Sequence, residues 1–257
     1  MPAKIKITKV SKVRKNYQVE TNIGKYTFDE ETLIKYQVFK DKEFTKAKFA
    51  EILNEVKINK IYNKTLNYLS YRMRSHYEVK EYLAKNDLNF SEADRVISRL
   101  KTHGYIDDEK FAKYFYDYYM RKNKGPKYIE QKLYEKRINK TIINDVVGGY
   151  SQKDQEEKIK QIVEKEAKSL ITYPVKKQRQ KLISKLIRAG FVGEIVYTIV
   201  NTAKLVDNSD ERLEKDFQKQ LKRLEHKNLE TYEIKQKIIA SLIAKGYEYQ
   251  KIKELLE

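Results

Sequence analysis

The chain has 257 residues and carries 55 lysines and arginines against 37 acidic residues, for a formal net charge of +18. It contains no cysteine, which excludes disulfides and thiolate metal sites, and no apolar run reaches the ~18 residues that cross a membrane. The N-terminal stretch MPAKIKITKV lacks the apolar core of a signal peptide, so we expect a cytoplasmic protein. Such a basic surface predicts a polyanionic partner, usually nucleic acid, although a lysine-rich coding bias gives the same composition.

Residues 1–44 are predicted to form a small antiparallel β-rich subdomain. The stretches KIKITKV, YQVET and KYTFD alternate or are rich in β-branched residues, as half-buried strands are. Asn22 to Gly24 is predicted to be the hairpin between the last two strands, and Glu30 to Tyr36 a single short helix. A domain this small is expected to rest against the part of the chain that follows it.

A junction between two helices is predicted near residue 75. A long helix that ends near Arg74 is indicated by apolar residues at helical spacing, namely Tyr62, Leu66, Leu69 and Met73. Ser75 and Glu78 have the spacing of a capping box, so a second helix is expected to start at His76. Arg72 and Arg74 fall off the apolar face, and we predict that both contact a protein partner.

Glycine, proline and aspartate indicate the next helix boundaries. Gly104 is placed to end a helix, and Asp107 and Asp108 are placed to cap the helix that follows. Gly125-Pro126 is a break followed by a proline, which favours the start of a further helix.

The sequence from residue 45 onward is predicted to be a tandem repeat. Four segments begin with a leucine and have an apolar residue five places later: Leu83 with Leu88, Leu133 with Ile138, Leu186 with Phe191, and Leu242 with Tyr247. The leucines are 50, 53 and 56 residues apart, a period typical of tandem arrays. A longer helix is predicted before each segment, over 45–75, 108–123, 152–170 and 209–227.

These patterns predict a mainly α protein in which the small N-terminal antiparallel β subdomain precedes tandem three-helix repeats. We place the repeats at 45–103, 104–150, 151–203 and 204–257. Because short amphipathic helices bury little alone, neighbouring repeats are expected to share a core and form an elongated curved array.

Two dense basic clusters are predicted to bind DNA. Residues 121–140 hold eight basic residues against two acids, and residues 176–188 hold six basic residues and no acid. The candidate DNA-binding residues are Lys122, Lys124, Lys127, Lys132, Lys136, Arg137, Lys176, Lys177, Arg179, Lys181, Lys185 and Arg188. On the preceding aromatic helix, Tyr116 and Tyr119 are predicted to face outward and bind a partner.

Three strings resemble the signature of the RecX family, the bacterial regulators of the RecA recombinase: YLSYRMRSHYEVKEYL at 68–83, HGYIDDEKFA at 103–112 and GPKYIEQKL at 125–133. The resemblance is close from Tyr68 to Leu133, and the third and fourth repeats match the family by pattern only. It implies a non-catalytic modulator, chiefly an inhibitor, acting in recombination, DNA repair and the SOS response. Such a protein would bind the RecA filament on single-stranded DNA and restrain its ATPase and strand exchange.

The same resemblance implies no cofactor, and we expect a monomer because charged terminal repeats can cap the array. Duplex DNA is a second candidate partner beside single-stranded DNA.

No catalytic constellation is recognised in the sequence. There is no P-loop, the three histidines are far apart beside predicted helix ends, and Asp107, Asp108 and Glu109 fit a helix start better than a metal site. Two alternatives stay open. One is a general basic helical-repeat DNA-binding protein or repressor that acts without RecA, and the other is a nuclease whose acids converge from distant segments.

Overall fold

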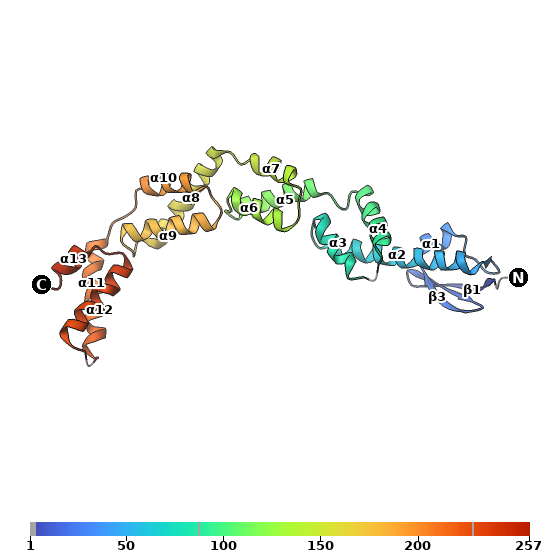
Figure 1. Cartoon of the computed structure of the whole chain (residues 1–257), viewed down its shortest axis with the longest axis horizontal. Helices are drawn as coiled ribbons and strands as arrows, with labels where there is room; N and C mark the ends of the chain where they lie inside the picture. Colours follow the sequence, from blue (N-terminus) through green and yellow to red (C-terminus); the bar gives the residue numbers. More distant parts are fainter. Residues whose placement is uncertain (1–3, 87, 228) are drawn as a thin grey trace. The chain divides into compact units, whose positions relative to one another are not determined.

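The computed structural model describes residues 4–86, 88–227 and 229–257 as a small four-stranded sheet and a series of helices, the first of which lies between the third and fourth strands (Figure 1). The strands are β1 (Ile5–Val13), β2 (Asn16–Thr21), β3 (Gly24–Phe28) and β4 (Glu43–Phe44). The helices are α1 (Glu30–Lys35), α2 (Lys46–Ser70), α3 (His76–Ala84), α4 (Phe90–Thr102), α5 (Asp108–Arg121), α6 (Pro126–Glu135), α7 (Lys140–Gly148), α8 (Gln152–Leu170), α9 (Val175–Arg188), α10 (Gly193–Thr202), α11 (Ser209–Glu225), α12 (Thr231–Lys245) and α13 (Tyr249–Glu254).

The chain divides into two compact units. Unit 1 comprises Met1–Phe111 and Lys136–Ile138, and unit 2 comprises Ala112–Glu135 and Asn139–Glu257. Unit 1 therefore holds the sheet and α1 to α4, whereas unit 2 holds α6 to α13 and most of α5.

The sheet of unit 1 has the strand order β3-β2-β1-β4, and every pair is antiparallel. Alternation explains β1, since Ile5 and Ile7 are buried while the lysines between and beside them are exposed. The predicted hairpin is confirmed: Thr21 pairs with Gly24, and the Thr21 hydroxyl accepts from the Gly24 amide at 3.1 Å. The strand β4 was not predicted, because two residues are too few to show the alternation of buried and exposed side chains that indicates a strand.

Helix α2 belongs to two hydrophobic cores. Its first half contributes Phe49 and Ile52 to the core of the sheet, and its second half contributes Ile58 and Ile61 to the core shared with α3 and α4. The helix ends at Ser70, before the end near Arg74 that the sequence predicts. The β subdomain thus rests on the first repeat through a helix that both of them use.

The leading leucines of the four repeats are all in the core. Their side chains are buried: the exposed fraction is 0% for Leu83, Leu133 and Leu242 and 1% for Leu186. Each lies near the end of its helix, Leu83 in α3, Leu133 in α6, Leu186 in α9 and Leu242 in α12. In the last three repeats the chain then turns through a left-handed residue, at Arg137 (φ 57°), Gly190 (φ 89°) and Gly246 (φ 99°). This turn sends the next apolar residue back into the core, which accounts for the five-residue spacing in the sequence.

Each of these left-handed turns lies against the start of the second helix of the preceding repeat. In what we name the α3 joint, the Ser75 hydroxyl donates to the Lys136 carbonyl at 3.1 Å. In the α6 joint, the Gly125 amide donates to the Ala189 carbonyl at 2.8 Å, and the Lys127 amide donates to the Gly190 carbonyl at 3.0 Å. These bonds satisfy groups at helix ends that have no partner within their own helix.

The capping box of Ser75 and Glu78 is present as predicted. Asp107 also caps α5 as predicted, accepting from the amides of Glu109 and Lys110, both at 3.0 Å. Asp108 lies in the first turn of α5, where a negative charge suits the helix end, but the prediction that it caps α5 is wrong, because its carboxylate accepts from the His76 amide at 2.8 Å. It therefore caps α3, 32 residues earlier, instead of its own helix.

Candidate nucleic-acid interface

The first part of the site is the turn that follows α5. Asn123 adopts a left-handed conformation (φ 58°), and the Lys124 amide donates back to the Tyr119 carbonyl at 3.0 Å, which ends the helix. Lys122 and Lys124 flank Asn123, and both line the same cavity.

The second part is the outward face of α9. Leu182 and Leu186 point into the core of unit 2, so the residues between and beyond them lie toward the surface. Two of these, Lys185 and Arg188, line the cavity that Lys122 and Lys124 also line. The cavity measures about 430 Å³, and it joins residues from both basic clusters, which are separate in the sequence.

A second cavity of about 350 Å³ adjoins the first, and the two share Glu166, Lys185 and Arg188. It adds Lys177 and Lys181 from earlier turns of α9. We name the combined surface the basic cleft, lined by the six cations Lys122, Lys124, Lys177, Lys181, Lys185 and Arg188.

The basic cleft carries a large excess of positive charge. Its only lining carboxylate, among the residues that the structure describes, is Glu166 of α8, which pairs with Lys185 at 2.5 Å. Six cations therefore face one acid, and like charges held this close are stabilised by a polyanion.

Tyrosine rings accompany these cations. The Lys124 amine lies 4.4 Å from the centre of the Tyr128 ring, and Lys181 lies 4.3 Å from that of Tyr173. Tyr119 packs beside Tyr128, with ring centres 5.3 Å apart. A basic groove with adjacent aromatic rings is the surface that single-stranded nucleic acid binds, through phosphate pairing and base stacking.

The other predicted DNA-binding residues do not line the basic cleft. Lys127 and Lys176 are exposed beside it, and Arg179 is half-buried. Lys132 pairs with Glu135 at 2.6 Å. Lys136 and Arg137 belong to unit 1, where they take part in the α3 joint.

Arg72 and Arg74, the predicted partner contacts, both have contacts within the chain. Arg72 pairs with Glu78 at 2.8 Å, and its side chain keeps 48% of its surface exposed. Arg74 lies flat on Tyr68, with the guanidinium 3.6 Å from the ring centre, and donates to the Tyr68 carbonyl at 3.2 Å. Both arginines therefore have contacts within the chain that the helical pattern does not reveal, and their role as partner contacts stays a prediction.

Glu78 is a buried carboxylate at the centre of an ion-pair network. It accepts from Arg72, from the Ser75 amide at 3.2 Å and from Lys136 at 2.7 Å. Burial raises the pKa of its carboxyl, but the hydrogen bonds from Arg72, Lys136 and Ser75 outweigh burial and lower that pKa to about 2. Lys136 is therefore already paired with a carboxylate of the chain in the α3 joint, and its role in DNA binding stays a prediction.

The tyrosines of α5 are placed differently from the prediction. Tyr116 packs on the core of unit 2, edge-on to Tyr150 with ring centres 6.0 Å apart, and burial raises the pKa of its hydroxyl. Tyr119 is half-buried in the aromatic cluster beside the basic cleft. The exposed rings are instead Tyr114 (49%) and Tyr118 (42%).

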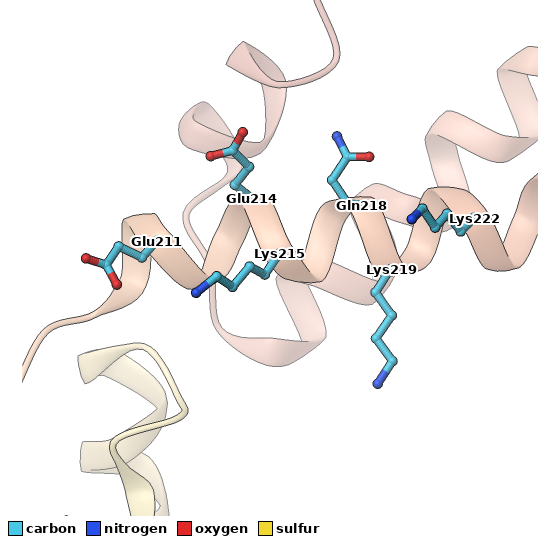
Figure 2. A pocket seen from close by; sticks show the side chains of 6 residues that line it. All are labelled: Glu211, Glu214, Lys215, Gln218, Lys219 and Lys222. Carbon is cyan, nitrogen blue, oxygen red and sulfur yellow. The ribbon is translucent and has the colours of Figure 1, made fainter.

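A larger cavity of about 670 Å³ lies on α11 (Figure 2). All six residues that line it come from that single helix, and they mix acids with lysines: Glu211, Glu214, Lys215, Gln218, Lys219 and Lys222. This face offers neither a second wall nor one sign of charge, so it is a weaker candidate than the basic cleft.

Within the described part of the chain, no group of three or more potential ligand residues could hold a metal ion. The histidines lie at helix ends as predicted: His76 begins α3, and His103 and His226 follow the ends of α4 and α11. No helix among the described residues is long and apolar enough to cross a membrane.

Comparisons with known proteins agree over nearly the whole chain. Family models for the first and second three-helix domains of RecX match residues 62–100 and 107–147. The regulatory protein RecX of Listeria monocytogenes serotype 4a is 34% identical, over 98% of this chain and 96% of the relative. That of Streptococcus agalactiae serotype V is 30% identical, over 98% of each chain.

Solved structures give the same result. A crystal structure of regulatory protein RecX covers 77% of this chain and all of its own, with a TM-score of 0.64 and 25% identity. The RecX structure from Lactobacillus salivarius covers 56% of this chain and 95% of its own, with a TM-score of 0.52 and 32% identity. The chain therefore belongs to the RecX family of regulatory proteins.

Proposed function

We propose that this protein is a non-catalytic regulator of the RecA recombinase that binds the RecA filament on single-stranded DNA and restrains its ATPase and strand exchange. Membership of the RecX family supports RecA as the partner. The basic cleft carries the DNA part of the proposal, because it brings cations from two distant segments together beside tyrosine rings. In this reading the protein works in the cytoplasm, in recombination, DNA repair and the SOS response.

The repeats supply a physical mechanism for acting on a filament. We treat 45–103, 104–150, 151–203 and 204–257 as successive modules of one monomer. When one module is bound, the effective concentration of the next at its site is high, so modest contacts add up. A ligand that prefers one state of the filament shifts the filament toward that state. Sedimentation at increasing concentration tests the monomer, since a rising mass would contradict it.

The ATPase rate of RecA on single-stranded DNA, measured at two salt concentrations while this protein is titrated in, tests the proposal. We expect hydrolysis to fall at amounts well below one molecule per RecA. No effect on hydrolysis, while the protein still binds DNA alone, would remove RecA from the proposal.

A double variant tests the basic cleft in the same assay. Lys122→Glu with Arg188→Glu takes one cation from each cluster, and both residues are exposed. Each phosphate contact to a single strand contributes about 0.7 to the slope of log affinity against log salt concentration. Loss of two such contacts is therefore expected to weaken binding roughly 25-fold at 0.1 M salt. Lys153→Glu with Lys160→Glu, on the exposed face of α8, is the matched control. Equal losses in both double variants would argue against the basic cleft.

Arg72 remains our proposed contact with RecA, because nearly half of its side chain is exposed beside the Glu78 pair. Arg74, Tyr116 and Tyr119 stay predictions, and each would first have to leave an internal contact. Arg72→Gln in the ATPase titration, with a thermal melt of the variant, separates a lost contact from lost stability. An unchanged titration would remove Arg72.

A general DNA-binding protein that acts without RecA is the second candidate. The observation in its favour is that the basic cleft is built from this chain alone. It predicts tight duplex binding that depends on sequence, and an unchanged RecA ATPase. A nuclease is tested by incubating labelled DNA with magnesium or manganese, where cleavage would contradict a non-catalytic role.

A further inference from the structure

A second basic cavity lies in unit 1, between the sheet and α2. It measures about 690 Å³. One wall comes from β3, with Lys25 and Tyr26, and the other is a single face of α2. We name it the α2 groove, with the polar lining residues Lys57, Lys60, Asn63, Lys64 and Asn67 on the helix.

The spacing on α2 explains why these residues share one face. Lys57, Lys60, Lys64 and Asn67 follow each other by three, four and three positions, which is one side of a helix. Leu53 and Val56 begin the same wall and pack on the core of the sheet. Ile58 and Ile61 of the same helix are buried in the other core, whereas Lys60 and Lys64 are exposed and belong to neither core.

Some lysines of the α2 groove have an ion-pair partner within the described chain and others do not. Lys25 pairs with Glu20 at 3.2 Å, and Lys57 pairs with Glu92 at 3.2 Å. Lys60 and Lys64 have no ion pair with any residue that the structure describes, and both are exposed. Like charges four positions apart on a helix repel each other, and no acid of the described chain offsets the repulsion between Lys60 and Lys64.

Among the described residues that line the α2 groove, Asp29 is the one acid, and its carboxylate already has hydrogen-bond partners. Its carboxylate accepts from the Thr32 amide at 2.8 Å, from the Thr32 hydroxyl at 2.7 Å and from the Asn59 side chain at 3.1 Å. These bonds cap α1 and leave the lysine face to an external anion.

We propose that the α2 groove binds a single strand of nucleic acid, with Lys60 and Lys64 on its phosphates. The side-chain amides of Asn63 and Asn67 lie on the same face, and an amide can pair with the Watson–Crick edge of a base, which only an unpaired strand exposes. Tyr26 supplies an aromatic ring at the opposite wall. This site goes beyond the proposed function, because it lies in unit 1, shares no residue with the basic cleft and requires no RecA.

Titration of a labelled oligo-dT strand with the full chain, without RecA and at several salt concentrations, tests the site. The double variant Lys60→Glu with Lys64→Glu is expected to bind the strand roughly 25-fold more weakly at 0.1 M salt. The slope of log affinity against log salt concentration should fall by about 1.4, which is the contribution of two phosphate contacts. The control is Lys9→Glu with Lys40→Glu, two exposed lysines of unit 1 outside the groove with the same charge change, where a loss under twofold is expected.

Lys60→Gln with Lys64→Gln removes the charges with little effect on the helix, and it serves if the glutamate pair unfolds α2 in a thermal melt. Unchanged affinity in the folded glutamine pair would overturn the proposal, and so would an equal loss in the lysine control. Equal affinity for a duplex of the same length, lost equally in the variant, would overturn the assignment to a single strand. The basic cleft variant, titrated in parallel, keeps a failure of that site separate from a failure of this one.

Discussion

The α3 joint and the α6 joint occupy equivalent places in successive repeats and are built from different chemistry. At the α3 joint, side chains make the contact: Ser75 donates to the Lys136 carbonyl, and Glu78 binds Lys136. At the α6 joint the contact is between backbone atoms, because the amides of Gly125 and Lys127 donate to carbonyls of the opposing turn.

The difference follows from the residues at the left-handed turn and at the helix start. A side chain on Gly125 would overlap the backbone of Gly190, and one on Gly190 would overlap Tyr128. With Ser75 and Arg137 in the equivalent places, the α3 joint has side chains where the α6 joint has glycines. It is held by ion pairs to the buried Glu78. The α6 joint should therefore be sensitive to volume, and the α3 joint to charge and pH.

Gly190→Ala is expected to have the largest effect. The substitution combines a left-handed backbone (φ 89°) with a steric overlap at Tyr128. The two costs together are roughly 2–5 kcal/mol in the free energy of unfolding of unit 2. Urea unfolding gives the total, and faster hydrogen exchange at the Lys127 amide would locate the damage in the α6 joint. Gly148→Ala is the control, because nothing lies within 4 Å of its added carbon.

Two further variants separate the cost of the steric overlap from the cost of the left-handed backbone, namely Gly125→Ala and Gly104→Ala. At Gly125 the added carbon meets the backbone of Gly190 and Phe191, so overpacking alone should cost about 1–3 kcal/mol. At Gly104 nothing lies within 4 Å but φ is 71°, so the backbone term alone should cost about 1–2 kcal/mol. Urea unfolding of both variants checks the sum, and a Gly125→Ala protein as stable as the native one would disprove close backbone contact.

Glu78→Gln should destabilise unit 1 by about 1–3 kcal/mol at neutral pH, because Arg72 and Lys136 lose their charged partner. Since the folded pKa of Glu78 is lowered to about 2, its contribution is present above pH ~4.5 and is lost as pH falls toward 2. Urea unfolding at several pH values should show this loss in the native chain and a smaller one in the variant. Glu81→Gln, an exposed position on the same helix, is the control. A parallel pH dependence in both proteins would contradict the role of Glu78.

Arg137→Gly should have the smallest effect on the free energy of unfolding, and it should stabilise the protein instead of destabilising it. Arg137 holds a left-handed conformation (φ 57°) that glycine adopts at little cost, so the variant should gain about 0.5–1 kcal/mol. Arg137→Ala keeps the backbone cost while it removes the contact with Tyr77, whose ring centre lies 5.8 Å from the guanidinium. If both variants lose stability equally, the side chain matters more than the turn.

Local patterns predicted much of the fold. The Ser75 capping box, the hairpin before Gly24, the helix starts at Pro126 and Gln152, and the repeated leucines all depend on residues close in the sequence. The short strand β4 and the end of α2 were missed, because two residues carry no period and a helix end without a cap leaves no local signal.

The candidate site was only partly predictable. Charge density identified both basic clusters, but periodicity could not show that Lys122 and Lys124 meet Lys185 and Arg188, because that depends on how α5 and α9 pack. For the same reason the sequence could not show that Glu166 lines the basic cleft and pairs with Lys185. Nor could the sequence show that Lys136 is held by Glu78, 58 residues away.

The sequence by itself determined the family, the mainly helical class with its small sheet, and the caps and turns that space the repeats. Those features arise from interactions within a few residues, or from a pattern that repeats along the chain. The tertiary structure alone decided which lysines share a surface, which are neutralised by distant carboxylates, and which tyrosines of α5 stay exposed. Each of these depends on contacts between residues far apart in the chain, and a residue's own neighbours in sequence carry no record of them.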